Sequence, residues 1–316
     1  MMQATLPRQH PAWYTPSDLP EEVLAFDTSV RGGLGVGAAG KVGLLELTLA
    51  PCGGITRVQK QYHQAPLHIY RPIYLDPRRP DMAFIFMLQA GDGFVQGDRY
   101  RIDIDCAPTA AAHITTQAAT NVFRAQHNFA TQLVNLHAGA GAVLEYLPEP
   151  VVPFRGSRLF QRVCVTADPQ STVILGETLL PGRVARGEAH VYDLFWADTE
   201  ARRADGTLLF ADALHLNPAG GDSPTSIGLL GPHDVIATLY IITWQANAAT
   251  LVALLRSALA GCDDVLAGVS ELPNCCGAVV RLLGPASKPV KAASRTAWNA
   301  ARMALLGAPA PNLRKG

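Results

Sequence analysis

Residues Gly91–Arg124 read GDGFVQGDRYRIDIDCAPTAAAHITTQAATNVFR, and this stretch decides the fold class. Glycine–aspartate turns open it, and an alternating segment follows at Arg99–Cys106, in which Tyr100, Ile102 and Ile104 share one face. Alternate residues of a β-strand lie on opposite faces. The pattern therefore predicts a strand with one face on a core and the other on water or a partner.

A dense run of hydroxyl and amide side chains, Thr115–Asn121, comes next (TTQAATN). Small alanines inside the run suit a backbone that turns closely beside another strand. We interpret Thr115–Thr120 as a structural bend that fixes the register of the neighbouring strands.

Short strand-like segments bounded by Gly, Pro and Asp continue on both sides of this stretch. We predict strands near Val42–Leu49, Thr56–His63, Leu67–Ile73, Ala83–Leu88, Arg99–Cys106, Ala111–Thr116, Thr131–His137, Val143–Leu147, Leu159–Val165, Thr172–Leu180, Glu188–Trp196, Thr207–Leu214 and Val235–Thr243. Strands at this spacing without intervening helices predict a mainly β architecture. A doubly wound sheet is excluded because it needs a helix between successive strands.

Two helices are predicted in the C-terminal third. Asn247 is placed to cap a helix over Ala248–Ala260. A second helix is predicted from about Lys288 to Leu306, with Ser287 as the candidate cap and Gly307 as its end.

Length and composition favour one large β-rich domain over 31–316, preceded by a Pro-rich, loosely ordered arm at 1–30. The 316 residues carry 26 basic and 26 acidic side chains, and 48% of the residues are hydrophobic. Zero net charge removes the repulsion that keeps proteins apart, so we expect large protein contacts. No basic stripe is present for a nucleic acid.

The N-terminal residues lack the apolar core of a secretory signal, and no apolar window is long enough to span a membrane. The six cysteines are scattered and form no C-x-x-C pair. Reduced thiols in a cytoplasmic protein fit this usage best.

A glycine-rich segment, Gly32–Lys41, contains the G-x-G-x-x-G pattern of dinucleotide-binding loops and nearly matches the G-x-x-x-x-G-K pattern of phosphate loops. Val42 stands where a phosphate loop needs Ser or Thr, and a strand rather than a helix follows. We therefore interpret it as a flexible turn. The histidines show no metal-ligand spacing either, and His63 and His68, five residues apart, are expected on opposite faces of one strand.

Four carboxylates are of interest for their sequence environment, namely Glu177, Glu188, Glu149 and Asp98. Glu177 interrupts an apolar run (VILGETLL), and an unpaired buried charge there costs several kcal/mol. It needs water, a metal ion or a partner such as Arg183 or Arg186. Turn chemistry alone also accounts for Asp98, which lies between glycine turns.

Several motifs together resemble the urease accessory proteins called UreD, or UreH in some bacteria. They keep the order of that family over about residues 40–215. The matching segments are Ala65–Pro72, Gly93–Asp98, Thr115–Thr120, Leu144–Pro148 with Phe154, Gly182-Arg183 and Gly187-Glu188. Asp92 replaces a usual glycine, Asn121 a usual lysine, and Glu149-Pro150 alters a Pro-Gln-Glu-Thr type of segment.

The resemblance implies an elongated fold of stacked β-sheets with a β-helix-like path and two helices. It implies a scaffold without enzyme activity or a tightly bound cofactor. Such a scaffold docks on apo-urease, joins a UreF-like helical protein and, through it, a UreG-like GTPase, and handles nickel in transit. With this implied role, our candidates for residues that line a nickel path are Glu177, Glu188, Glu149 and Asp98. A dimer of the accessory complex is also implied.

Two other classes stay open from the residues alone. A stand-alone β-solenoid enzyme or binding module for carbohydrate would need carboxylates and aromatic platforms in one groove, and only 7% of the residues are aromatic. A structural β-protein without a metal role would differ only by lacking nickel-linked partners.

Overall fold

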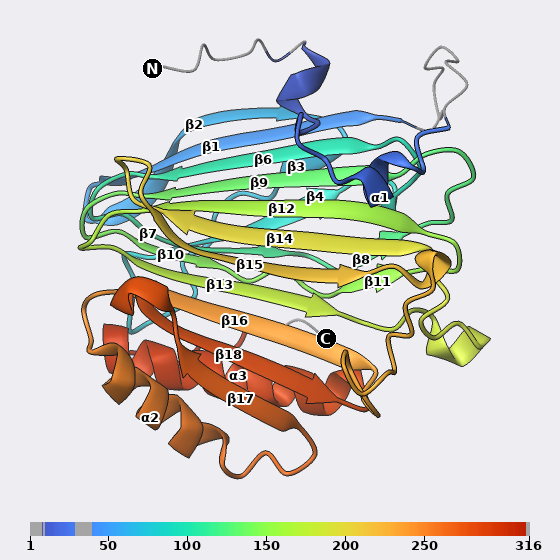
Figure 1. Cartoon of the computed structure of the whole chain (residues 1–316). Coiled ribbons are helices and arrows are strands. Elements are labelled where there is room, and N and C mark those ends of the chain that lie inside the picture. Colours follow the sequence, from blue (N-terminus) through green and yellow to red (C-terminus); the bar gives the residue numbers. More distant parts are fainter. Residues whose placement is uncertain (1–7, 9, 29–39, 314–316) are drawn as a thin grey trace.

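Two stacked β-sheets make up most of the chain in the computed structural model, which describes residues 8, 10–28 and 40–313 (Figure 1). The first sheet, here sheet A, has 7 strands in the order β15-β14-β12-β9-β6-β1-β2. Its strands are β1 (Val42–Cys52), β2 (Ile55–Gln64), β6 (Arg99–Cys106), β9 (Ala130–Ala138), β12 (Arg158–Ala167), β14 (Leu194–Arg202) and β15 (Leu208–Leu216).

The second sheet, sheet B, runs in the order β17-β18-β16-β13-β10-β7-β4-β3. Its strands are β3 (Leu67–Ile69), β4 (Ala83–Gln89), β7 (Ala111–Thr116), β10 (Val143–Tyr146), β13 (Thr172–Leu179), β16 (Val235–Thr243), β17 (Leu266–Glu271) and β18 (Gly277–Gly284). Three short strands continue this sheet along a third side: β5 (Gly93–Phe94), β8 (Thr120–Val122) and β11 (Val151–Pro153).

The chain winds between the sheets as a coil. Strands β6, β9 and β12 of sheet A alternate along the sequence with β7, β10 and β13 of sheet B, and neighbours within each sheet are parallel. The stretch Gly91–Arg124, with which the sequence analysis began, forms β5, β6, β7 and β8. These four strands make one full turn of the coil. The predicted β-helix-like stacking is confirmed.

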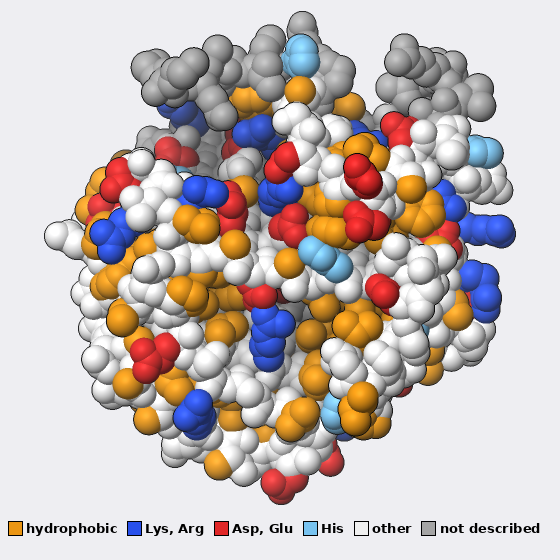
Figure 2. Space-filling model, viewed as in Figure 1, with side chains coloured by type: hydrophobic (Ala, Val, Ile, Leu, Met, Phe, Trp, Pro, Cys, Tyr) orange, Lys and Arg blue, Asp and Glu red, His pale blue; other side chains and the backbone are white. Residues whose placement is uncertain are grey.

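Apolar side chains from the inner faces of both sheets form the main core. Ile102, Ile104 and Leu136 of sheet A meet Ile114 and Leu144 of sheet B, all almost fully buried. The outer face of sheet A is mainly polar, as the alternation in β6 predicts, whereas the outer face of sheet B carries a second apolar cluster together with the C-terminal helices. Figure 2 shows Lys and Arg side chains interspersed with Asp and Glu on the face that it displays.

Position 93 requires glycine because the backbone there lies very close to the backbone of β8. Its φ of +145° is unfavourable for side-chain-bearing residues, and an added Cβ would lie 2.0 Å from the carbonyl oxygen of Asn121 on β8. Asp92 beside it also adopts a positive φ, 61°. The glycine–aspartate turn thus places β5 directly against β8.

Two long helices cover one end of sheet B (Figure 1). Helix α2 (Ala248–Leu259) begins as predicted, with Asn247 Oδ1 accepting a hydrogen bond from Thr250 N at 3.1 Å. Helix α3 (Ser287–Leu306) ends at Gly307, as predicted. The proposed cap is wrong, because Ser287 is already the first helical residue and Ala286 precedes it. None of the described helices is long and apolar enough to cross a membrane.

The described part of the N-terminal segment packs on sheet A. Short helix α1 (Glu21–Leu24) follows the 3-10 turn Pro11–Trp13. Val23 is buried against Phe160 and Leu194 of the sheet. This packing differs from the loosely ordered arm expected at 1–30. The glycine-rich segment Gly32–Lys41 lies almost wholly outside the described residues.

Strand boundaries match both where residues alternate, as in β6, and where a strand is buried along almost its whole length, as in β7 and β16. The bounds predicted for β6, β7 and β16 are those observed. The strand predicted over Glu188–Trp196 is wrong, because β14 begins only at Leu194. Residues before it form a turn in which His190 has a φ of 55°, and the ion-paired Glu188 lies within that turn.

A candidate polar path between the sheets

Polar side chains interrupt the apolar core along one line between the sheets. Gln132 and Gln161 are register partners on β9 and β12, and both lie on the inner face of sheet A. Gln161 Nε2 donates a hydrogen bond to Glu177 Oε1 of sheet B. This bond joins the two sheets through polar groups rather than through apolar contacts.

These side chains border a small internal cavity of about 30 Å³, which Thr116 and Thr120 also line. A cavity this small accommodates a water molecule or a single ion. Its walls combine hydroxyl, amide and carboxylate oxygens, which are ligands for hard and borderline cations.

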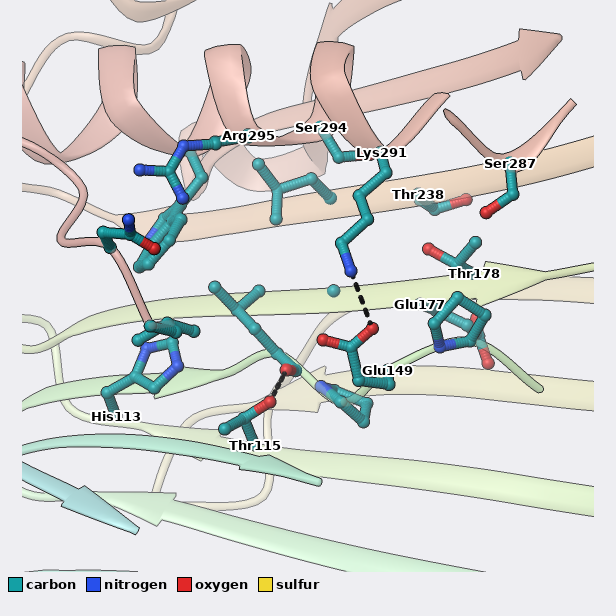
Figure 3. Close-up of a pocket in the computed structure, with 18 residues that line it drawn as sticks. His113, Thr115, Glu149, Glu177, Thr178, Thr238, Ser287, Lys291, Ser294 and Arg295 are labelled. Carbon is teal, nitrogen blue, oxygen red and sulfur yellow. Dashed lines mark hydrogen bonds and ion pairs between the residues drawn. The ribbon is translucent and has the colours of Figure 1, made fainter. Parts of the chain in front are cut away.

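Larger cavities adjoin the internal one on two sides. One, of about 280 Å³, shares Thr116, Thr120 and Gln132 with it and reaches the exposed Asp92. The other, of about 190 Å³, lies beneath α3 and shares Glu149 and Glu177 with it (Figure 3). We call this series of three cavities the polar path.

Glu177 lies where the internal cavity meets the cavity beneath α3. Partial burial and the negative charge of Asp212 raise the pKa of Glu177 to about 7, while the positive charge of Arg281 opposes them. The carboxyl group is therefore near its titration point at neutral pH. Of the alternatives left open for Glu177, the ion pair with Arg183 is not formed, because Arg183 binds Glu188 and Gln161 donates a hydrogen bond to Glu177.

Glu149 lies at the mouth of the path beneath α3. Its backbone N–H donates to Thr116 Oγ1 at 2.9 Å, so the bend that follows β7 holds the loop that carries it. Its Oε2 lies 3.2 Å from Lys291 Nζ of α3 (Figure 3). The predicted structural role of the Thr115–Thr120 run agrees with these contacts.

Glu188 lies elsewhere, in the turn after the 3-10 segment Val184–Arg186. Arg183 holds it with two hydrogen bonds, Nε to Oε2 at 2.8 Å and Nη2 to Oε1 at 2.7 Å. These bonds lower the pKa of Glu188 below its usual range. Glu188 does not line any of the three cavities, so the structure assigns it a structural ion pair.

Asp98 is a turn residue. Its buried carboxylate accepts hydrogen bonds from Lys41 N at 2.8 Å, Val95 N at 3.0 Å and the Tyr100 hydroxyl at 2.8 Å. It lines none of the three cavities. Of the four carboxylates predicted for the path, the structure brings Glu149 and Glu177 together and separates the other two from them.

A buried charge network beside the path escaped the sequence analysis. Arg302 of α3 donates to Glu145 at 2.9 and 3.0 Å and also bonds Asp76. His113 Nδ1 lies 2.7 Å from Glu145. Burial alone would raise the pKa of Glu145, but its contacts with His113 and Arg302 outweigh it and lower that pKa.

The spacing of residues along α3 could have identified Arg302 as a buried residue. Arg302 follows Trp298 by four residues and so falls on the buried face of α3 that also holds Val290 and Ala301. A lone cation on an apolar stripe requires acidic partners across the interface. Glu145 supplies one from β10, at a position within the Leu144–Pro148 motif.

Histidine placement also differs from the prediction. His63 and His68 lie on β2 and β3, which are separate strands, and their ring centroids are 4.9 Å apart. The chain reverses between them at Ala65-Pro66. Within the described ranges, no group of three or more His, Cys, Asp or Glu side chains is arranged to hold a metal ion.

The fold and the cavities together define a coiled β-sheet protein with polar groups lining adjoining cavities between and beside its sheets. The family model described as UreD urease accessory protein matches residues 41–316. The chain is 44% identical to urease accessory protein UreD 2 of Streptomyces griseus, over 92% of this chain and 100% of that protein.

Relatives from archaea show the same similarity. The UreD protein of Haloarcula marismortui is 36% identical over 89% of this chain and 92% of its own length. The UreD protein of Cenarchaeum symbiosum is 34% identical over 90% of this chain and 99% of its own length. The chain belongs to the UreD urease accessory protein family.

Proposed function

We propose that this protein is a scaffold for urease maturation, that it docks on apo-urease, and that nickel passes through the polar path on its way to the urease active site. The observation that carries the proposal is the junction at Glu177. There a carboxyl group, bonded to Gln161, stands between two adjoining cavities in an otherwise apolar core.

The donors of the path suit transit rather than storage. At the internal cavity they are carboxylate, amide and hydroxyl oxygens, whereas nickel prefers nitrogen and sulfur donors. Oxygen donors bind the ion weakly enough to release it to the next site. Nickel is thus a cargo of this protein in the proposal and not a resident cofactor.

The proposal assigns the other activities to partners. A UreF-like protein would bind this chain and recruit a UreG-like GTPase, and the accessory complex would form a dimer in the cytoplasm. Balanced charge supports extensive docking, since 26 basic and 26 acidic residues leave little net repulsion. We assign GTP hydrolysis to the UreG-like partner, because Val42 and the following strand depart from a phosphate loop.

Co-purification tests the docking part. The tagged chain is expressed with apo-urease and with UreF- and UreG-like proteins, and the mass of the eluted complex is measured. We expect a complex that contains apo-urease. A folded chain that elutes alone beside folded partners would contradict the scaffold role and favour the carbohydrate-binding alternative.

Replacement of Glu177 tests the passage part. We expect Glu177→Gln to assemble normally but to reduce the nickel content of urease in cells about 10-fold or more, because the two cavities share two carboxylates and the variant keeps only Glu149. The matched control is Glu271→Gln, a change at an exposed position of β17. Normal nickel loading in Glu177→Gln cells would exclude this role for Glu177.

A further inference from the structure

A cation of the protein itself stands at one mouth of the polar path. Lys291 projects from α3 across the cavity, and its Nζ lies 3.2 Å from Glu149 Oε2 (Figure 3). The Glu149 side chain is 18% exposed and the Lys291 side chain 59%. The carboxylate is therefore held within the protein, while the ammonium group has free access to solvent.

The ammonium group of Lys291 lies beside the Glu149 carboxylate oxygen that an incoming metal ion would bind. A divalent cation at Glu149 and the Lys291 ammonium compete for one carboxylate, and their like charges exclude close approach of both. Arg295, one turn further along α3, lines the same cavity and adds a second positive charge. Lysine suits such a role because its flexible four-carbon stem lets a compact charge swing away.

We propose that Lys291 is the resting occupant of this mouth, where its ammonium group takes the place of a divalent cation beside Glu149 until a cation displaces it. The inference rests on the proposed passage of nickel. Its consequence is a concentration threshold. Abundant divalent cations that bind oxygen donors weakly, such as Mg²⁺, fail to displace the tethered ammonium, whereas nickel binds the same donors more strongly.

Calorimetric titration of the full-length chain with Ni²⁺ tests the proposal. We expect Lys291→Met to tighten nickel binding about two- to fivefold, the range expected when a partly exposed ion pair is no longer in competition. Lys288→Met is the matched control, because Lys288 is exposed on the same helix and lies outside the cavity. Its affinity should equal that of the wild type.

Arg295→Met separates local competition from general repulsion. It removes a positive charge from the same cavity but leaves the Lys291–Glu149 pair intact, so its gain in affinity should be smaller than that of Lys291→Met. An equal gain in both variants would overturn the proposal, because it would show that only the summed positive charge matters.

A double-mutant cycle distinguishes this inference from the proposed function. We expect the gain from Lys291→Met to vanish in a Glu149→Gln background. If Glu149→Gln weakens nickel binding but Lys291→Met has no effect except a lower melting temperature, Lys291 only ties α3 down and the proposal is wrong. If neither Glu149→Gln nor Glu177→Gln alters nickel binding, the proposed passage itself is contradicted.

Discussion

Glu177 carries both a raised pKa, which affects stability, and the central role in the proposed passage of nickel. Its pKa rises from 4.5 to about 7 in the folded chain, so the folded state keeps a proton that the unfolded state loses. As pH rises from about 4.5 to 7, ionisation of the unfolded chain lowers the free energy of unfolding, and above that window the full penalty applies.

Thermal unfolding of Glu177→Gln tests whether the raised pKa destabilises the folded chain at high pH. We expect the variant to be more stable than the wild type by about 1–3 kcal/mol near pH 8 and nearly equal to it near pH 4.5. Glu271→Gln serves as the exposed control. A gain of the same size at both pH values would contradict a titrating Glu177 and would point to altered packing instead.

Side chains on the path were predictable to different degrees. Glu177 was recognisable because a charge interrupts an apolar run, and Glu149 because it departs from a familiar motif. Their partners were not, because Gln161 and Lys291 come from a strand and a helix that only the coil brings near. Local sequence indicates which residue needs a partner, but the topology decides which residue provides it.

At the scale of elements, the attachment of α3 depends on the buried network. Helix α3 closes the cavity beneath it, and Arg302 binds Glu145 of β10 and Asp76. All three side chains are almost fully buried. The same helix carries Lys291, so a change in its seating would also change the mouth of the path.

Arg302→Met should therefore loosen α3. Removing the cation leaves two buried carboxylates without their partner, and we expect a loss of about 3–5 kcal/mol in the free energy of unfolding. Hydrogen exchange should accelerate over Ser287–Leu306 before it does in β6. Arg295→Met, an exposed change on the same helix, is the control. Unchanged exchange in α3 would show that apolar contacts alone hold it.

Element boundaries were predictable where a single rule applied. Regular alternation gave β6, a largely apolar run gave β16, and an asparagine cap gave α2. The start of β14 was missed because the ion pair of Glu188 with Arg183 stabilises a turn where alternation favours a strand. The short strands β5, β8 and β11 carry too few residues for any periodicity.

At the scale of the whole molecule, docking and passage occupy different parts of the protein. The proposed docking would use the outer surface, while the proposed passage would use the polar cavities between the sheets and beneath α3. Gln132 is a residue of the polar path and not of the outer surface, since it lines both the internal cavity and the cavity that reaches Asp92. A change at Gln132 can therefore separate the two proposed activities.

Gln132→Leu removes an amide from the path and keeps a side chain of similar size. We expect the variant to fold and to co-purify with apo-urease as the wild type does, but to lower the nickel content of urease about 10-fold, because the ion meets an apolar wall at that point. Gln59→Leu, at an exposed position of β2, is the control for solubility. Full nickel loading with Gln132→Leu would mean that nickel does not pass between the sheets, even if the chain still docks on urease.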